Sequence, residues 1–578
     1  MHVMLRAFFS IIQRTASNRR RSSSREISPD DILIDSHNLP QFDNHQLEGR
    51  LDQPISKTSL IIVGIVFLLA LVGFSVRAWF VQVHNGEYYA QKSENNRLRH
   101  TPIFAARGVV LDRNGVELAW NSPQDDDPAV LDRKYIDKGG FAHVLGYVQY
   151  PTKDSSGFYY REDFEGVDGV EKFLNDELKG VNGLNLVEVD ARGKISAQNI
   201  IQPAKAGATV ELSIDSRIQA ALYDSIRDIA ERVGFTGGAG VIMDVHTGEI
   251  IAMTSYPEFD PYIMSRKHDA AKLKEYLSSK SSPFLSRATN GLYTPGSIVK
   301  PFMSLAALNE KIINPEKQIL STGSISIKNE YDPKLSTIFR DWKAHGYVDM
   351  RKAITVSSDV YFYAIGGGYK DQKGLGITNI NKYMKSFGFG EPITNPFFGS
   401  TKGVVPSPEW KAANFDGETW RLGNTYHTSI GQYGFQVTLI QMARAYSMIA
   451  NEGDLIDPTI LKTKTPTVMR TIDMPKSYFD IVHEGMRGST LDGTSVSLKV
   501  PYVEVAAKSG TAELGVAKDK VNSWMTGFWP YKEPKYAFVV MLERGSVHNL
   551  IGAGAAMREL LDWMHTNTPE YFSDSPAS

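Results

Sequence analysis

Ser297 and Lys300 have the residue types and the spacing for serine-based acyl transfer. They lie in TPGSIVKPF, where Pro-Gly indicates a turn and the residues after Ser297 are mostly apolar. Residues i and i+3 share one helix face, so Lys300 can reach the Ser297 hydroxyl. A hydroxyl needs a base to become a good nucleophile, and a lysine acts as one only when neutral, which burial favours. Alone, the motif favours the alternative of a helix-capping serine and a surface lysine.

A second polar motif is Ser357-Ser358-Asp359, between apolar flanks in KAITVSSDVYFYAIG. Ser357 and Asp359 are two residues apart, so both could enter one cleft. There they would hydrogen-bond Lys300 and a substrate amide. A polar loop or a helix cap is the alternative for this common tripeptide.

The third motif, Lys508 to Thr511, is KSGT within VEVAAKSGTAEL. A glycine inside a strand often marks a close approach of another backbone, and an edge strand can bind an extended peptide. The hydroxyls of Ser509 and Thr511 and the charge of Lys508 would then face a substrate carboxylate. A bulged surface strand is the alternative.

The elements around these motifs indicate an α+β domain. Two apolar runs in 240–257 flank a His-Thr-Gly-Glu turn and predict an antiparallel hairpin, and three more strands are expected near the end, the last at 536–543. Helical periodicity follows Ser216, the expected cap, and recurs near the C-terminus. Strands at both ends with helices between them predict one antiparallel sheet covered by helices.

Residues 81–208 predict an elongated, strand-rich unit. RGVVLDRNGVELAWN (107–121) and GLNLVEVDARGKI (183–195) each alternate around a turn, and 169–180 has helical spacing. No internal repeat is present.

One apolar segment predicts a membrane span. Residues 58–76 carry no charge, and about 20 apolar residues cross a bilayer core. A buried core helix would rarely lack polar residues over this length, and a cleaved signal peptide would have a shorter apolar stretch. Basic residues precede the span, so we expect a cytoplasmic N-terminus and an external C-terminal part. Residues 18–44 are rich in Ser, Asp, Pro and Arg and predict disorder.

Composition excludes several classes of function. The net charge of −2 does not suggest nucleic acid, and the absence of cysteine removes disulfides, thiol nucleophiles and cysteine-ligated metals. Asp341, His345 and Asp349 are spaced i, i+4, i+8, but a loop or core role is favoured over a metal site. We expect no cofactor and no metal.

The order S-x-x-K, S-x-[ND], K-[ST]-G resembles that of penicillin-binding proteins and serine β-lactamases. Further blocks, such as GVDGVEKFLNDELKG, GVIMDVHTGEIIAMTSYPEFDP and SIGQYGFQVTLIQMARAYSMIANEG, resemble the class B penicillin-binding proteins over roughly 107–543. The resemblance implies the penicillin-binding transpeptidase fold on a pedestal, with one N-terminal transmembrane helix. Asp359, where the family usually has Asn, is more similar to the elongation group (penicillin-binding protein 2-like) than to the division group.

The resemblance also implies an activity and site roles. Lys300 would activate Ser297 to attack the D-Ala-D-Ala carbonyl of a peptidoglycan stem peptide, and an amine from a second stem peptide would close the cross-link. Ser357, Asp359 and Lys508 would complete the catalytic group. Ser509, Gly510 and Thr511 would bind substrate, and backbone N–H groups of Ser297 and Thr511 would stabilise the oxyanion. β-Lactams would acylate Ser297.

The expected organisation is a cytoplasmic tail (1–57), a signal anchor (58–80), a pedestal (81–208), a transpeptidase domain (209–566) and a C-terminal tail (567–578). The chain would cross the bacterial inner membrane once, with the catalytic domain periplasmic or extracellular. The family partners would be a RodA-like glycosyltransferase and other elongation proteins. The family's large head lobe between 121 and 146 is reduced here to about two dozen residues.

Two other functions remain open from the sequence. A D,D-carboxypeptidase would use the same motifs and pass the acyl group to water. A scaffold, non-catalytic or with a dual role, would keep the fold and activate a membrane glycosyltransferase. The three complete motifs argue against a purely structural role.

Overall fold

The computed structural model describes residues 57–89, 98–123, 131–154, 159–189, 195–266, 269–328, 332 and 334–572. Contacts divide the chain into two units, 1–97 and 98–578. The expected cytoplasmic tail lies, except for its last residue, outside the described residues, as do the last six residues of the chain.

The first unit contains α2 (Lys57–Trp79), which continues into the π-helical η4 (Phe80–His84). Within the described ranges, Lys57–His84 is the one helix that is long and apolar enough to cross a membrane. The predicted span 58–80 lies inside it.

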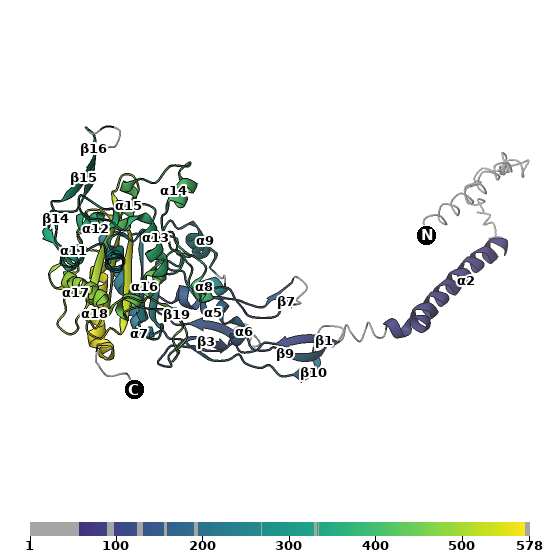
Figure 1. Ribbon diagram of the computed structural model, residues 1–578. Coiled ribbons are helices and arrows are strands. Elements are labelled where there is room, and N and C mark those ends of the chain that lie inside the picture. Colours follow the sequence, from purple (N-terminus) through teal and green to yellow (C-terminus); the bar gives the residue numbers. More distant parts are fainter. Residues whose placement is uncertain are drawn as a thin grey trace, which may run out of the picture. The chain divides into compact units, whose positions relative to one another are not determined.

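The second unit is built on a five-stranded antiparallel sheet with strand order β13-β12-β22-β21-β20. The strands from the C-terminal part of the chain are drawn in yellow in Figure 1. The strands of the sheet are β12 (Gly237–Asp244), β13 (Ile250–Tyr256), β20 (Ala506–Leu514), β21 (Lys520–Trp529) and β22 (Tyr536–Ser546). The predicted hairpin and the three late strands are therefore confirmed. The strand that carries the KSGT motif, β20, forms one edge of the sheet.

Helices cover both faces of this sheet. On one face α7 (Ser216–Val233) and α18 (Ala553–Asn567) pack together, and on the other lie α10 (Lys300–Asn309), α16 (Leu439–Ala450) and α17 (Lys476–Asp492). Strand residues alternate between two cores, so that Val241 and Met243 join the α10–α16 side and Ile242 joins the α7–α18 side. The expected α+β architecture is confirmed.

The remaining elements of this part fill the region between β13 and β20. They are α8 (Pro261–Arg266), α9 (Ala270–Ser278), η5 (Gly296–Val299), β14 (Ile319–Ser321), β15 (Ser324–Lys328), β16 (Ser336–Arg340), β17 (Gly346–Val348), α11 (Met350–Val356), α12 (Asp359–Gly367), α13 (Gly376–Ser386), η6 (Pro396–Phe398), α14 (Pro408–Asn414), α15 (Leu422–Ser429), β18 (Asp454–Ile456), β19 (Val468–Thr471) and η7 (Val496–Leu498), while η8 (Pro569–Tyr571) follows α18.

Short strands and helices make up residues 98–211. One sheet has the order β1-β9-β10 and another β11-β2-β3-β4, with two small pairs, β5-β8 and β6-β7. Their bounds are β1 (Leu98–Ile103), β2 (Val110–Leu111), β3 (Glu117–Pro123), β4 (Leu131–Tyr135), α4 (Ala142–Leu145), β5 (Val148–Gln149), β6 (Thr152–Lys153), β7 (Tyr159–Arg161), β8 (Glu165–Gly166), α5 (Gly169–Phe173), α6 (Asn175–Leu178), β9 (Gly183–Val189), β10 (Ile195–Gln202) and β11 (Val210–Glu211). Both hairpins predicted from alternation are present as β2-β3 and β9-β10.

A buried charge cluster holds this strand-rich part together. The Glu171 carboxylate accepts from Arg107 Nε at 2.5 Å and from Arg133 Nε at 2.7 Å, and all three side chains are about 1 % exposed. Arg107 also donates to the Phe164 carbonyl, and Arg133 to that of Gly108. One carboxylate thus joins β4, α5 and the segment before β2.

The cap of α7 differs from the expectation. Asp215, not Ser216, is the N-cap, because its side chain accepts from the Arg217 backbone N–H at 3.0 Å. Ser216 begins the helix, and its hydroxyl donates to Asp112 at 2.7 Å. Both residue types are favoured caps, so periodicity places the helix start only to within a residue or so.

Candidate active site

Ser297 lies in η5, a single 3₁₀ turn that leads into α10. Gly296 has φ +60°, and a Cβ there would lie 2.8 Å from the Thr511 carbonyl oxygen, so a side chain would strain the turn and collide with β20. The turn is tied down by Tyr446, whose hydroxyl donates to the Ile298 carbonyl at 2.7 Å, and by Gly296 N–H, which donates to the Gly431 carbonyl at 2.9 Å.

Lys300 is fully buried at the start of α10. Its Nζ donates to Asp359 Oδ1 at 2.6 Å, to the Ser357 carbonyl at 2.8 Å and to Ser357 Oγ at 3.2 Å. The expected direct hydrogen bond to Ser297 is not made, because the Lys300 ammonium donates its hydrogen bonds to these three acceptors instead. Among the described side chains none is hydrogen-bonded to the Ser297 hydroxyl, and such bonds often tighten only when substrate is bound.

The Ser357-Ser358-Asp359 motif forms the junction of α11 and α12. Ser357 ends α11 with φ +58°, an uncommon conformation for a residue other than glycine, and Ser358 caps α12. This corner brings the Ser357 hydroxyl and the Asp359 carboxylate to the same ammonium. Backbone strain of this kind is typical of functional sites.

Asp341 supports this junction through hydrogen bonds. The sequence had offered it only as one member of a weak metal-site hypothesis. Asp341 Oδ2 accepts from Ser358 Oγ at 2.9 Å and from the Val360 backbone N–H at 3.0 Å, while Oδ1 lies 3.5 Å from His345 Nε2. Asp349 is engaged elsewhere, as the N-cap of α11. Within the described ranges no group of three or more His, Asp or Glu side chains is placed to hold a metal ion.

Lys508 donates to the same Ser357 hydroxyl. On β20 it is fully buried, and its Nζ donates to Ser357 Oγ at 2.9 Å and to the Ser509 carbonyl at 2.7 Å. Two lysines from distant parts of the chain therefore share one hydroxyl. Ser509 Oγ donates to Thr494 Oγ1 at 2.6 Å, a contact that no sequence signal indicated.

Gly510 permits β20 to approach η5. A Cβ on Gly510 would lie 2.7 Å from Ile298 Cγ2 and 3.1 Å from the Pro295 carbonyl oxygen. Only a residue without a side chain allows this distance. The expectation that the glycine marks a close backbone approach is confirmed.

Burial and neighbouring charges perturb the titration of this group. Burial holds the pKa of Lys508 well below its ordinary value, the charge of Lys300 lowers it further, and Asp359 opposes both. Burial raises the pKa of Asp359, with Lys300 opposing this and Asp341 adding to it. Perturbed groups that meet in a cleft are typical of sites that move protons.

The site opens into a cavity of about 1390 Å³. Ser297, Ser357, Asp359, Ser509, Gly510 and Thr511 all line it. Aromatic and polar side chains that the sequence did not single out also line it, and we call this part of the lining the aromatic side; it includes Phe339, Trp342, Tyr363, His427, Gln432 and Tyr433. The structure thus brings all three motifs together, with Lys300 and Lys508 buried beneath the cavity surface.

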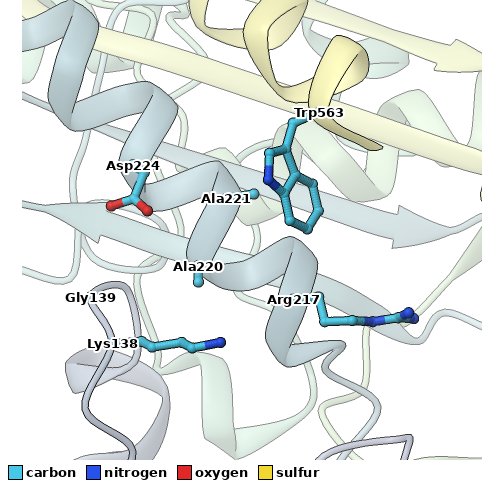
Figure 2. Close-up of a pocket in the computed structure, with 7 residues that line it drawn as sticks. All are labelled: Lys138, Gly139, Arg217, Ala220, Ala221, Asp224 and Trp563. Carbon is cyan, nitrogen blue, oxygen red and sulfur yellow. The ribbon is translucent and has the colours of Figure 1, made fainter. Parts of the chain in front are cut away.

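A second, smaller pocket of about 400 Å³ is separate from these motifs (Figure 2). Figure 2 shows Trp563 of α18 above Ala220 and Ala221 of α7, with Lys138 and Arg217 below. Arg217 is ion-paired with Asp215 and Glu570. None of the seven labelled residues belongs to the three motifs.

Comparisons with known proteins give a consistent result. Residues 238–562 match the penicillin binding protein transpeptidase domain, and residues 129–212 match the penicillin-binding protein dimerisation domain. The peptidoglycan D,D-transpeptidase MrdA of Haemophilus influenzae is 28% identical, over 83% of this chain and 77% of the relative.

Solved structures are similar over most of the chain. PBP2 of Pseudomonas aeruginosa in complex with WCK 5153 has a TM-score of 0.67 and 29% identity, covering 83% of this chain and all of that one. A chain from a peptidoglycan synthase complex, described as coordinating polymerization and crosslinking, has a TM-score of 0.68 and 25% identity, covering 90% and 100%.

Proposed function

Because the chain belongs to the penicillin-binding protein transpeptidase family, we propose that Ser297 is the residue acylated in peptidoglycan cross-linking during cell elongation. The enzyme is a class B, penicillin-binding protein 2-like D,D-transpeptidase. The observation that carries the assignment of the site is the Ser357 hydroxyl shared by Lys300 and Lys508, in the cavity that also exposes Ser297.

In the first step Ser297 Oγ attacks the carbonyl between the two D-alanines. Its proton passes to Lys300, which must be neutral at that moment, and the backbone N–H groups of Ser297 and Thr511 stabilise the oxyanion. The C–N bond breaks, and the leaving D-alanine amine takes a proton relayed through Ser357. Lys508, Ser509 and Thr511 hold its carboxylate. The product is an ester on Ser297.

In the second step the amine of another stem peptide attacks that ester. The new amide forms as the ester C–O bond breaks, and the proton lost by the amine returns to Ser297 Oγ through Lys300. A carboxypeptidase would use water here. The ratio of aminolysis to hydrolysis separates these two functions.

We further propose a single-pass topology in the bacterial inner membrane. The helix Lys57–His84 would anchor the enzyme, with the N-terminus cytoplasmic and residues 98–572 periplasmic. A RodA-like glycosyltransferase would be the partner. The similarity to a chain of a peptidoglycan synthase complex supports a polymerase partner in general.

Penicillin should form one covalent adduct with the wild-type chain. We expect a fluorescent penicillin to label the full-length protein in membranes, and peptide mass spectrometry to place the added mass on the peptide that contains Ser297. A folded protein that remains unlabelled, or an adduct on another residue, would contradict the proposed site.

Asp359→Asn should shift the pH dependence of acylation. The charge of Asp359 raises the pKa of Lys508, so its neutralisation lowers that pKa and favours the neutral Lys508 amine. The substitution also replaces the carboxylate that accepts a hydrogen bond from Lys300. We therefore expect the acid limb of the acylation profile to move to lower pH. The maximal rate should fall by about tenfold or more, because a charge-assisted hydrogen bond worth about 1.5–3 kcal/mol is lost. Stopped-flow penicillin acylation across pH measures this, and an unmoved acid limb would contradict it.

A further inference from the structure

The catalytic cavity extends past the edge of the sheet onto the face that carries α18. In the β20–β21 register Ser509 lies opposite Met525, Thr511 opposite Ser523 and Glu513 opposite Val521. Residues directly opposite in an antiparallel pair point to the same face. Ala507 and Met525 belong to the core formed with α7 and α18, so this is the α18 face.

Small residues and backbone form the far wall on this face. The Ala553 N–H donates to Ser523 Oγ at 3.0 Å. A Cβ on Gly552 would lie 2.2 Å from that oxygen, and one on Gly554 would lie 2.6 Å from Ser497 Oγ. Val496 of η7, 52 % exposed, and Leu550, 100 % exposed, also line the cavity. We call this part of the cavity, lined by Val496, Ser497, Ser523, Met525, Leu550, Gly552 and Gly554, the α18-side hollow.

The cavity is larger than one small ligand needs. Sites for one small molecule usually measure about 300–1,000 Å³. The volume of about 1390 Å³ combines the aromatic side with the α18-side hollow. Ser509 and Thr511, which would hold the terminal carboxylate, line the same cavity. Glu513 and Lys518, ion-paired at 2.6 Å, also line the cavity and offer both signs of charge.

The direction of the reaction distinguishes the two parts. The amine must attack the ester carbonyl from the side that the leaving D-alanine vacates. That D-alanine points its carboxylate at Ser509 and Thr511, hence towards the α18-side hollow. Resting on the proposed function, we propose that this hollow binds the acceptor: the stem peptide that brings a side-chain amine to the acyl-enzyme. The donor peptide lies on the aromatic side.

Filling the hollow should impair aminolysis by a peptide and leave acylation intact. We would form the acyl-enzyme of the full-length protein from a D-alanyl thioester donor. The acyl-enzyme would then be mixed with one of two acceptor amines. One is a tripeptide with an amine on its third side chain. The other is free D-alanine, which is small enough to need only the part of the cavity beside Thr511. In Val496→Trp the ratio of aminolysis to hydrolysis should fall by about tenfold or more with the tripeptide. With D-alanine it should stay within about threefold, and penicillin labelling should stay at the wild-type rate.

Val468→Trp on β19 is the matched control, because Val468 is similarly exposed at 45 % and does not line the cavity. Leu550→Trp supplies a second variant on another wall, should Val496→Trp not fold. An unchanged tripeptide ratio in a folded, labelled variant would overturn the proposal, and so would an equal loss with both amines or a loss of labelling. Failure of the wild-type protein to be acylated would instead refute the proposed function.

Discussion

Ser297→Ala should abolish covalent labelling by penicillin and all cross-linking while the protein stays folded. The Ser297 side chain is half-buried and makes no hydrogen bond among the described residues, so its loss removes little packing or bonding energy. We expect a change of no more than about 0.5 kcal/mol in the free energy of unfolding, typical of a site without such contacts. Activity should fall to background, because the variant lacks the hydroxyl that forms the ester.

Membranes that carry wild-type and Ser297→Ala protein would be labelled in parallel and their thermal unfolding compared. This variant also tests the scaffold alternative, because a scaffold would still support polymerisation by its partner when labelling is gone. Residual labelling of the variant would show that a different nucleophile is acylated.

Glu171→Gln should cause a large loss of stability. The carboxylate is the shared partner of Arg107 and Arg133, and both guanidinium groups would stay buried without their counter-charge. Breaking a buried ion pair on one side typically costs about 3–5 kcal/mol. We expect a loss of this size in the free energy of unfolding, measured by urea titration followed by tryptophan fluorescence.

Glu559→Gln is the control for the removal of one carboxylate charge. Its pair with Arg232 is exposed, with side chains 41 % and 58 % accessible. Such a pair is worth up to about 1 kcal/mol. Equal effects of the two substitutions would show that the buried cluster contributes no more than a surface pair.

The sequence predicted the parts of the site that depend on local signals and on motif order. The turn before Ser297, the strand around Gly510 and the hairpin that became β12-β13 each have a periodicity or a turn signature. Contacts between side chains far apart in the sequence have none. The bond between Ser509 and Thr494 and the support of Ser358 by Asp341 could therefore not be predicted.

The state of Lys300 illustrates the same limit. The motif alone favoured a surface lysine, and only the apolar run after Ser297 pointed to burial. The folded chain shows that Lys300 is buried and that its donors go to Ser357 and Asp359. The i, i+3 rule describes one helix. Here two other helices, α11 and α12, supply the acceptors, which are Ser357 at the end of α11 and Asp359 at the start of α12.

The position of β20 at the edge of the sheet also bears on solubility. An edge strand offers unpaired N–H and C=O groups to any extended chain, including a copy of the same protein, and such edges favour aggregation. The strand cannot be capped by another strand without closing the site to substrate. Instead η5 packs against it at Gly510, and the charged pair of Glu513 and Lys518 lies towards its open end. The charges of this pair therefore discourage another copy of the chain from pairing with β20.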